Sequence, residues 1–268
     1  EGGVRVMPAY PSREDVQRRI RTPRVLEEGL RSIRTSGGGT EFDQLRDYRP
    51  VDEFRRIDWP STVRLQRTIV KQYRAVRIQN IMLLLDNGRV MAGTVGGVPR
   101  VEHAMDAALG VVQAATKLGD RVGMLAFDRQ VRSILVPTNG KSQLGRAAEA
   151  MYMLEPDYSE SAYQVAFNDA TARFRRRSLF IVLTDLVEAV VEQALLPALP
   201  TITRRHLVVV AAVQDPAVTA WAAGGAHRWA SEAYREAAAV NVLHERARAI
   251  ARLRAAGAMV VDAAPGQL

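Results

Sequence analysis

Short apolar runs alternate with helix-forming segments from Gln79 to the end of the chain, and this alternation limits the possible folds more than any other feature. Buried strands separated by helices are typical of a doubly wound α/β sheet, whose two faces are both covered. The predicted strands cover residues 81–86, 121–127, 131–136, 178–185, 206–213 and 258–263. The predicted helices cover residues 100–118, 142–154, 161–176, 188–199 and 228–256.

The predicted strand at 131–136 differs from the others because it follows its predecessor across only three residues, 128–130. So short a connection forms a hairpin, in which the two strands run antiparallel. We therefore predict a mostly parallel sheet with one antiparallel edge strand.

Residues 1–74 have a different character, since they are rich in Arg, Pro and Gly and contain no long periodic segment. We predict an irregular or partly β appendage at 1–74 and an α/β domain at 75–268. No apolar run approaches the roughly 20 residues that a membrane-spanning helix needs. Because the chain begins with Glu1 and not with Met, we expect a processed protein or an excised piece, which a membrane anchor can precede.

The composition removes several kinds of site. The sequence contains no Cys, which excludes disulfides, thiolate zinc sites and thiol nucleophiles, and its four His are not paired at helical spacing. The net charge is +8, and the basic residues are dispersed apart from the run RFRRR at 173–177. Nucleic-acid binding centred on this run is one alternative function, which predicts an affinity that falls steeply with salt.

Two carboxylates, Asp86 and Asp185, each end a predicted buried strand. In an open α/β sheet, ligands bind beyond the carboxyl ends of the strands where the strand order reverses, so both side chains can reach one crevice. A second alternative function is therefore an enzyme that uses Asp86 and Asp185 with Mg²⁺ for phosphoryl-transfer or nuclease chemistry. The sequence positions no Lys, His or further acidic group beside them.

From about residue 78 to its end, the chain resembles the von Willebrand factor A-like domain. The resemblance rests on the strand that ends at Asp86, the long helix, the hairpin, and the segments TNGKSQLGRAAEAM (138–151) and FIVLTDL (180–186). That family holds a divalent cation on an Asp-x-Ser-x-Ser motif, a loop Thr and a further Asp. The resemblance implies that Asp86, Ser142 and Asp185 match the first Asp, the loop Thr and the last Asp.

Two ligands of the family's site are missing here, because Gly88 and Val90 stand where the motif has serines. The resemblance therefore implies a degenerate metal-ion-dependent adhesion site with poor affinity for Mg²⁺, which prefers a full set of oxygen ligands. If no ion binds, we expect Arg89 or another Arg to neutralise the two carboxylates, because a guanidinium can pair bidentately with a carboxylate.

Residues 37–73 combine aromatic and charged side chains at fixed spacing, and they resemble the signature of a bacterial family called domain of unknown function 58. The matching positions are Gly37, Gly39, Glu41, Phe42, Leu45, Arg46, Tyr48, Asp52, Arg55, Ile57, Asp58 and Trp59. Members of that family join this segment to a von Willebrand A-like domain. The chain departs from the pattern at Val51, where the family usually has Gly.

This second resemblance implies a non-catalytic, protein-interacting adaptor with a MoxR-type AAA+ ATPase as its partner. It also implies the cytoplasmic face as location, with or without a membrane anchor before residue 1. The charged and aromatic positions can either contact the partner or fasten the appendage to the sheet; they are Arg46, Asp52, Arg55, Asp58, Trp59 and Arg89. Of these, Asp58 and Trp59 are expected to be the most buried.

Overall fold

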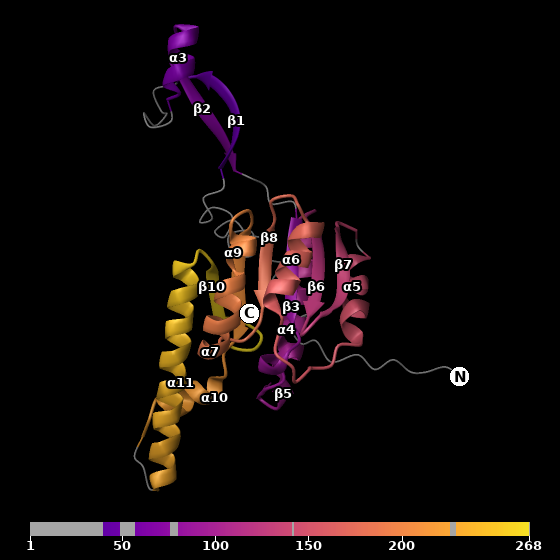
Figure 1. Ribbon diagram of the computed structural model, residues 1–268, viewed down its shortest axis with the longest axis vertical. Coiled ribbons are helices and arrows are strands. Elements are labelled where there is room, and N and C mark those ends of the chain that lie inside the picture. The colour runs from indigo at the N-terminus through magenta and orange to yellow at the C-terminus, as the bar shows by residue number, and fades with distance from the viewer. Residues whose placement is uncertain (1–39, 49–56, 76–79, 141, 226–228, 268) are drawn as a thin grey trace, which may run out of the picture. The chain divides into compact units, whose positions relative to one another are not determined.

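The computed structural model describes residues 40–48, 57–75, 80–140, 142–225 and 229–267. These residues fall into two compact units, one containing residues 40–75 and the other containing residues 80–267 (Figure 1). The larger unit is an α/β structure with a central sheet, and the described residues of the smaller unit form an antiparallel strand pair and a short helix.

The sheet of the larger unit has six strands in the order β10-β9-β8-β3-β6-β7. Their bounds are Asn80–Asp86 (β3), Arg121–Phe127 (β6), Val131–Thr138 (β7), Leu179–Leu183 (β8), Leu207–Val213 (β9) and Met259–Ala263 (β10). All neighbours pair in parallel except β6 and β7, which are antiparallel. The predicted mostly parallel sheet with one antiparallel edge strand is therefore confirmed.

Helices cover both faces of this sheet (Figure 1). The described helices of this unit are α4 (Arg100–Lys117), α5 (Gln143–Tyr152), α6 (Tyr163–Arg173), α7 (Glu188–Val190), the π-helix η3 (Val191–Leu195), α8 (Leu196–Ala198), α9 (Pro200–Thr203), α10 (Pro216–Ala222) and α11 (Ala230–Ala255), of which α10 packs on α11. Short elements between β3 and α4 are the 3₁₀ helix η2 (Arg89–Met91) and the strands β4 (Thr94–Val95) and β5 (Val98–Pro99).

The central strand β3 shows why this sequence forms a covered sheet. Six of its seven residues are buried, and side chains alternate between the two faces of a strand. Met82 and Leu84 lie in one core cluster with Phe167 of α6 and Leu253 of α11. The intervening positions face the opposite side, so both faces of β3 must be apolar.

The smaller unit pairs β1 (Thr40–Asp47) antiparallel with β2 (Ile69–Ala75) and places α3 (Trp59–Leu65) between them in sequence. Trp59, which we expected to be buried, is 60% exposed, and Asp58 is half-buried. Helix α3 turns Ser61 inward, and a rotation of about 100° per residue then directs Trp59 to the outside. Arg46 lies on β1, whereas Asp52 and Arg55 lie outside the described residues.

Candidate functional site

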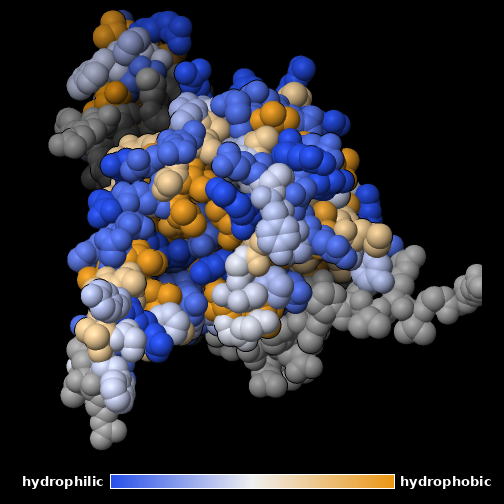
Figure 2. Space-filling view, turned by 60° about the horizontal axis from the view of Figure 1, so that its bottom comes forward, coloured by the Kyte–Doolittle hydropathy of each residue, from blue (hydrophilic) through white to orange (hydrophobic). Residues whose placement is uncertain are grey.

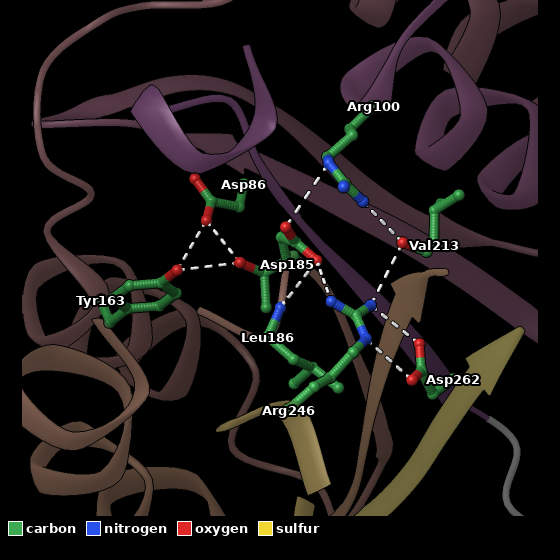
Figure 3. Close-up of polar contacts among 9 residues, drawn as sticks. Asp86, Arg100, Tyr163, Asp185, Leu186, Val213, Arg246 and Asp262 are labelled. Atoms are coloured by element: carbon green, nitrogen blue, oxygen red, sulfur yellow. Dashed lines mark hydrogen bonds and ion pairs between the residues drawn. The ribbon is translucent and has the colours of Figure 1, made fainter. Parts of the chain in front are cut away.

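The strand order reverses between β3 and β8, because the chain adds β6 and β7 on one side of β3 before it adds β8, β9 and β10 on the other. Ligands of open α/β sheets bind beyond the carboxyl ends of the strands at such a point. Asp86 is the last residue of β3, and Asp185 follows the end of β8 at Leu183. The structure therefore places both carboxylates at the same edge of the sheet (Figure 3).

Asp86 is fully buried, and both of its oxygens accept hydrogen bonds from neutral groups. Oδ1 accepts from the Ser161 hydroxyl at 2.5 Å and from the Gly88 amide at 2.9 Å. Oδ2 accepts from the Tyr163 hydroxyl at 2.6 Å and from the Thr184 hydroxyl at 2.6 Å. Burial raises the pKa of Asp86 above its usual value, and the four hydrogen bonds oppose that increase because they stabilise the charged form.

Tyr163 is held rigidly against this carboxylate. Its ring makes edge contacts with Phe127 and Phe167, with centroid distances of 5.4 and 6.0 Å, and its hydroxyl also lies 2.9 Å from the Thr184 hydroxyl. Burial, followed by the negative charge of Asp86, raises the pKa of Tyr163 well above its usual value, so the phenol stays a hydrogen-bond donor. No sequence motif points to this residue, because a Tyr at the start of a helix has no distinctive pattern around it.

Gly88 explains how Ser161 reaches Asp86. A Cβ atom at position 88 would lie 2.1 Å from the Ser161 hydroxyl and 3.1 Å from the Ser159 carbonyl. Since real Cβ atoms do not approach other atoms so closely, a serine at this position cannot coexist with Ser161 as it is placed. The hydroxyl of Ser161 thus fills space that the missing serine of the motif would need.

Ser142 does not lie at this crevice. Because β7 runs antiparallel to β6, its last residue Thr138 pairs with Val122, near the amino end of β6. Ser142 follows β7 and is exposed at the start of α5, so it lies at the edge of the sheet opposite to Asp86. Helix α5 carries the chain back, and the loop after it supplies Ser161. Because the antiparallel β7 reverses the chain direction, the residues that return to the carboxyl edge are those after α5.

Asp185 has charged partners, in contrast to Asp86 (Figure 3). Its Oδ1 accepts from Nη1 of Arg246 at 2.7 Å, and its Oδ2 lies 3.4 Å from Nε of Arg100. Arg246, from α11, also donates two hydrogen bonds of 2.8 Å to the carboxylate of Asp262 on β10. Both arginines donate to the carbonyl of Val213, Arg100 at 2.6 Å and Arg246 at 3.1 Å.

This network is nearly closed to solvent, since Arg246 is 8% and Asp185 is 6% exposed. Burial alone would lower the pKa of Arg246, but the hydrogen bonds and charges of Asp262 and Asp185 outweigh it and raise that pKa. Arginine side chains therefore do pair with Asp185, one of the two predicted carboxylates, and they belong to Arg246 and Arg100. Arg89 instead pairs with the exposed Glu160 at 3.4 Å.

The residues present do not fit a divalent cation of the kind that the fold family implies. Both Asp86 oxygens are already saturated by donors, Asp185 is paired with guanidinium groups, and Gly88 and Val90 supply no side-chain oxygen. Within the described residues, no three His, Cys, Asp or Glu side chains gather as a potential metal site. Mg²⁺ would have to displace several short hydrogen bonds before it could reach a carboxylate.

Two open pockets flank the saturated carboxylates at the carboxyl edge. One of about 300 Å³ is bordered by the Arg89–Glu160 pair, by Ser161 and by residues of α7 and the π-helix η3. The other, of about 400 Å³, is lined by Asn87, Arg132 and the loop that contains Met153 and Tyr158. Figure 2, with the lower end of Figure 1 turned forward, shows hydrophobic residues there in separate patches among hydrophilic ones.

The second pocket has features of a contact surface. Met153 and Tyr158 are 81% and 80% exposed, although large apolar side chains are usually buried. Asn87 is 2% exposed, donates its amide to the Glu155 carbonyl at 2.6 Å, and leaves its own carbonyl oxygen without a hydrogen-bond partner. Buried polar atoms without partners are uncommon in folded proteins.

Comparison with protein families matches residues 44–257 to the family described as "Protein of unknown function DUF58". No curated protein matches the sequence. Among solved structures, the chain is similar to the conserved hypothetical protein BatB from Bacteroides thetaiotaomicron, with 21% identity and a TM-score of 0.40, over 50% of this chain and 66% of that chain.

Two further solved structures are similar to this chain. The SpRpn10 VWA domain has 12% identity and a TM-score of 0.43, over 71% of this chain and 90% of its own. An aerotolerance-related membrane protein from Bacteroides fragilis has 15% identity and a TM-score of 0.34, over 63% and 98% of the two chains. The α/β unit has a mostly parallel, doubly wound sheet with one antiparallel edge strand, and the solved structures similar to the chain include a VWA domain. Among the described helices, none has the length and apolar content of a bilayer-spanning segment.

Proposed function

This chain belongs to the DUF58 family of proteins of unknown function, and we propose that it is a non-catalytic protein-interaction module whose carboxyl-edge surface works without a metal ion. The observation that carries the proposal is the internal saturation of Asp86 and Asp185. A catalytic carboxylate must be within hydrogen-bond reach of a reacting group, and these carboxylates face donors of the protein itself.

The same saturation weighs against the Mg²⁺-dependent phosphoryl-transfer or nuclease alternative. In that mechanism the carboxylates would orient metal ions that activate a nucleophile and stabilise a leaving group. Here Asp185 is held by Arg246 and Arg100, so an ion would meet positive charge at the position where it should bind. We therefore propose a degenerate adhesion site, and Mg²⁺ is not part of the proposed function.

The contact surface that we propose is the loop of residues 153–161 with its neighbouring pockets. It presents Met153 and Tyr158 to solvent beside a pocket of about 400 Å³, and exposed anchors of this kind suit protein recognition. The partner that we propose is a MoxR-type AAA+ ATPase, because the family resemblance implies one. In this proposal the protein acts at the cytoplasmic face.

The first test is isothermal titration of Mg²⁺ and Mn²⁺ into the full chain. We expect no binding heat at millimolar concentration, because no open set of oxygen ligands awaits the ion. Binding that Asp86→Ala and Asp185→Ala both abolish would refute the metal-independent part of the proposal.

The second test measures binding of the full chain to a purified MoxR-type ATPase by surface plasmon resonance. We expect Met153→Asp and Tyr158→Asp to weaken binding by about tenfold or more, as for anchor residues at interfaces. Val242→Asp, which alters an exposed apolar residue on α11, is the matched control and should bind as the parent does. Binding by neither the parent nor the control would refute the proposed partner.

A further inference from the structure

A basic pocket lies at the amino edge of the sheet, opposite to the saturated carboxylates. This edge is where β6 begins at Arg121, β7 ends at Thr138 and β8 begins at Leu179. The pocket has a volume of about 330 Å³. Its lining joins four arginines with apolar and small polar residues: Arg121, Arg173, Arg175, Arg176, Val136, Pro137, Phe174, Asn80 and Ser178.

The fold holds the walls of this pocket in place. Nη2 of Arg121 donates to the Pro137 carbonyl at 3.2 Å, which fixes one guanidinium against β7. Ser178 is buried, and its hydroxyl donates to the Arg176 carbonyl at 2.8 Å. Phe174 packs against the core cluster that contains Phe167 of α6. The backbone that carries the arginines is thus anchored on both sides.

The positive charge of the pocket is largely uncompensated. Arg173 pairs with Asp169 at 3.0 Å, whereas Arg175 and Arg176 are exposed and form no ion pair with any carboxylate in the described part of the chain. The lining itself contains no acidic residue among those described. A pocket of this kind attracts anions, because several like charges surround one concave space.

His206, which is buried beside Ser178, shows that further positive charge gathers at this edge of the sheet. Its ring nitrogen Nδ1 accepts a hydrogen bond from the Ser178 backbone amide at 3.3 Å. Burial, and then the charges of Arg205 and Arg177, lower the pKa of His206 from 6.5 to about 4. The arginines around the amino edge of β8 therefore oppose any further positive charge there.

We propose that this pocket binds an acidic, partly apolar segment of a protein partner. Guanidinium groups pair bidentately with carboxylates, and clustered arginines are a recurring means of binding acidic peptide motifs. Val136, which is 58% exposed, and Phe174 provide apolar contact beside the charges. Single-stranded nucleic acid would instead need a long basic track with several stacking rings, and this lining offers one ring.

This inference rests on the proposed function in one respect, namely that the ligand is a protein. It does not depend on the carboxyl-edge surface or on the identity of the ATPase. The probe is a short fluorescein-labelled peptide in which glutamates flank a leucine, and its binding to the full chain is measured by fluorescence anisotropy. A second peptide carries glutamine in place of every glutamate. A labelled single-stranded oligonucleotide is tested under the same salt conditions.

The variant Arg175→Glu/Arg176→Glu reverses the two unpaired charges of the pocket. Its matched control is Arg64→Glu/Arg254→Glu, which makes the same change in net charge at two exposed positions outside the lining. Thermal melts and circular dichroism of all proteins establish that each variant is folded.

We expect the acidic peptide to bind the parent and the control equally, and to bind the pocket variant about tenfold or more weakly. The glutamine peptide should bind none of them measurably. Equal weakening by pocket variant and control would overturn the proposal, and so would an oligonucleotide that binds the parent more tightly than the peptide does. If the parent binds the ATPase but not the acidic peptide, the pocket proposal fails and the proposed function stands. If the parent binds the acidic peptide but not the ATPase, the pocket proposal stands and the proposed ATPase partner fails.

Discussion

Replacing Tyr163 by Phe tests whether Asp86 is a buried anion that depends on internal donors. The substitution removes the hydroxyl that donates to Oδ2 of Asp86 at 2.6 Å, while the ring keeps its contacts with Phe127 and Phe167. A hydrogen bond to a charged group contributes about 1.5–3 kcal/mol to stability. Because Thr184 still donates to the same oxygen, we expect a loss of about 2 kcal/mol in the free energy of unfolding.

The assay is urea denaturation followed by circular dichroism, with the shift in midpoint read at unchanged slope. Tyr158→Phe is the matched control, because that side chain is 80% exposed, and its effect should stay within about 0.5 kcal/mol. Adding Thr184→Val completes a double-mutant cycle, in which we expect a coupling energy of about 1 kcal/mol since both hydroxyls bond to one oxygen.

The effect of Tyr163→Phe should also depend on pH. The folded-state pKa of Asp86 is raised, so the folded chain keeps a proton that the unfolded chain has released, and stability falls as pH rises above 3.8 toward the folded pKa. Loss of a donor raises the folded pKa further, so the deficit of the variant should grow with pH and shrink in acid. A deficit within about 0.5 kcal/mol at neutral pH, or one that is independent of pH, would refute the reasoning.

Three further predictions concern the charged network, the close approach at Gly88 and the buried histidine. Arg246→Met should cost about 3–5 kcal/mol in thermal or urea unfolding because it leaves buried carboxylates unpaired. Arg248→Met, at an exposed pair, should cost much less, and equal losses would contradict this account. Gly88→Ala should destabilise the fold by about 1–3 kcal/mol, because its Cβ would clash with Ser161. Gly145→Ala, with open space around it, should stabilise the fold slightly. The opposite order in melting temperature would disprove the close approach of Ser161 to Gly88. The pKa of His206 is lowered from 6.5 to about 4, so between these pH values the unfolded chain binds a proton that the folded chain does not. The free energy of unfolding should therefore fall by up to roughly 3 kcal/mol as pH drops from 6.5 to 4. His206→Gln should flatten that pH dependence in urea titrations, and an unchanged pH dependence would count against this explanation.

Much of the fold follows from local pattern. The apolar runs predicted at 81–86 and 121–127 correspond to β3 and β6, and the short connection at 128–130 identified the antiparallel edge strand β7. These features are readable because a strand covered on both faces must be apolar throughout, and a three-residue connection can only reverse the chain. The short helix α10 was not predicted, since seven residues next to a Gly-rich break give little periodic signal.

The candidate site was only partly readable in the same way. Asp86 and Asp185 could be placed at one sheet edge, because each ends a buried strand and parallel strands end together. Ser142 was selected by resemblance to a motif, but the direction of β7 puts it at the opposite edge, and the hydroxyl that contacts Asp86 belongs to Ser161. The burial of Trp59 was predicted wrongly because the outward turn of α3 depends on which residue of the helix packs inward.

The sequence by itself determined the α/β class, the antiparallel edge and the positions at which carboxylates end strands, since these depend on hydrophobic period and on chain connectivity. Only the tertiary structure decided the partners of those carboxylates. Asp86 is saturated by hydroxyls from residues 75 to 98 positions away, and Asp185 is neutralised by Arg246, 61 positions away. Such partners are set by the packing of α6 and α11 on the sheet, and a hydrogen bond between residues so distant in sequence has no local signature.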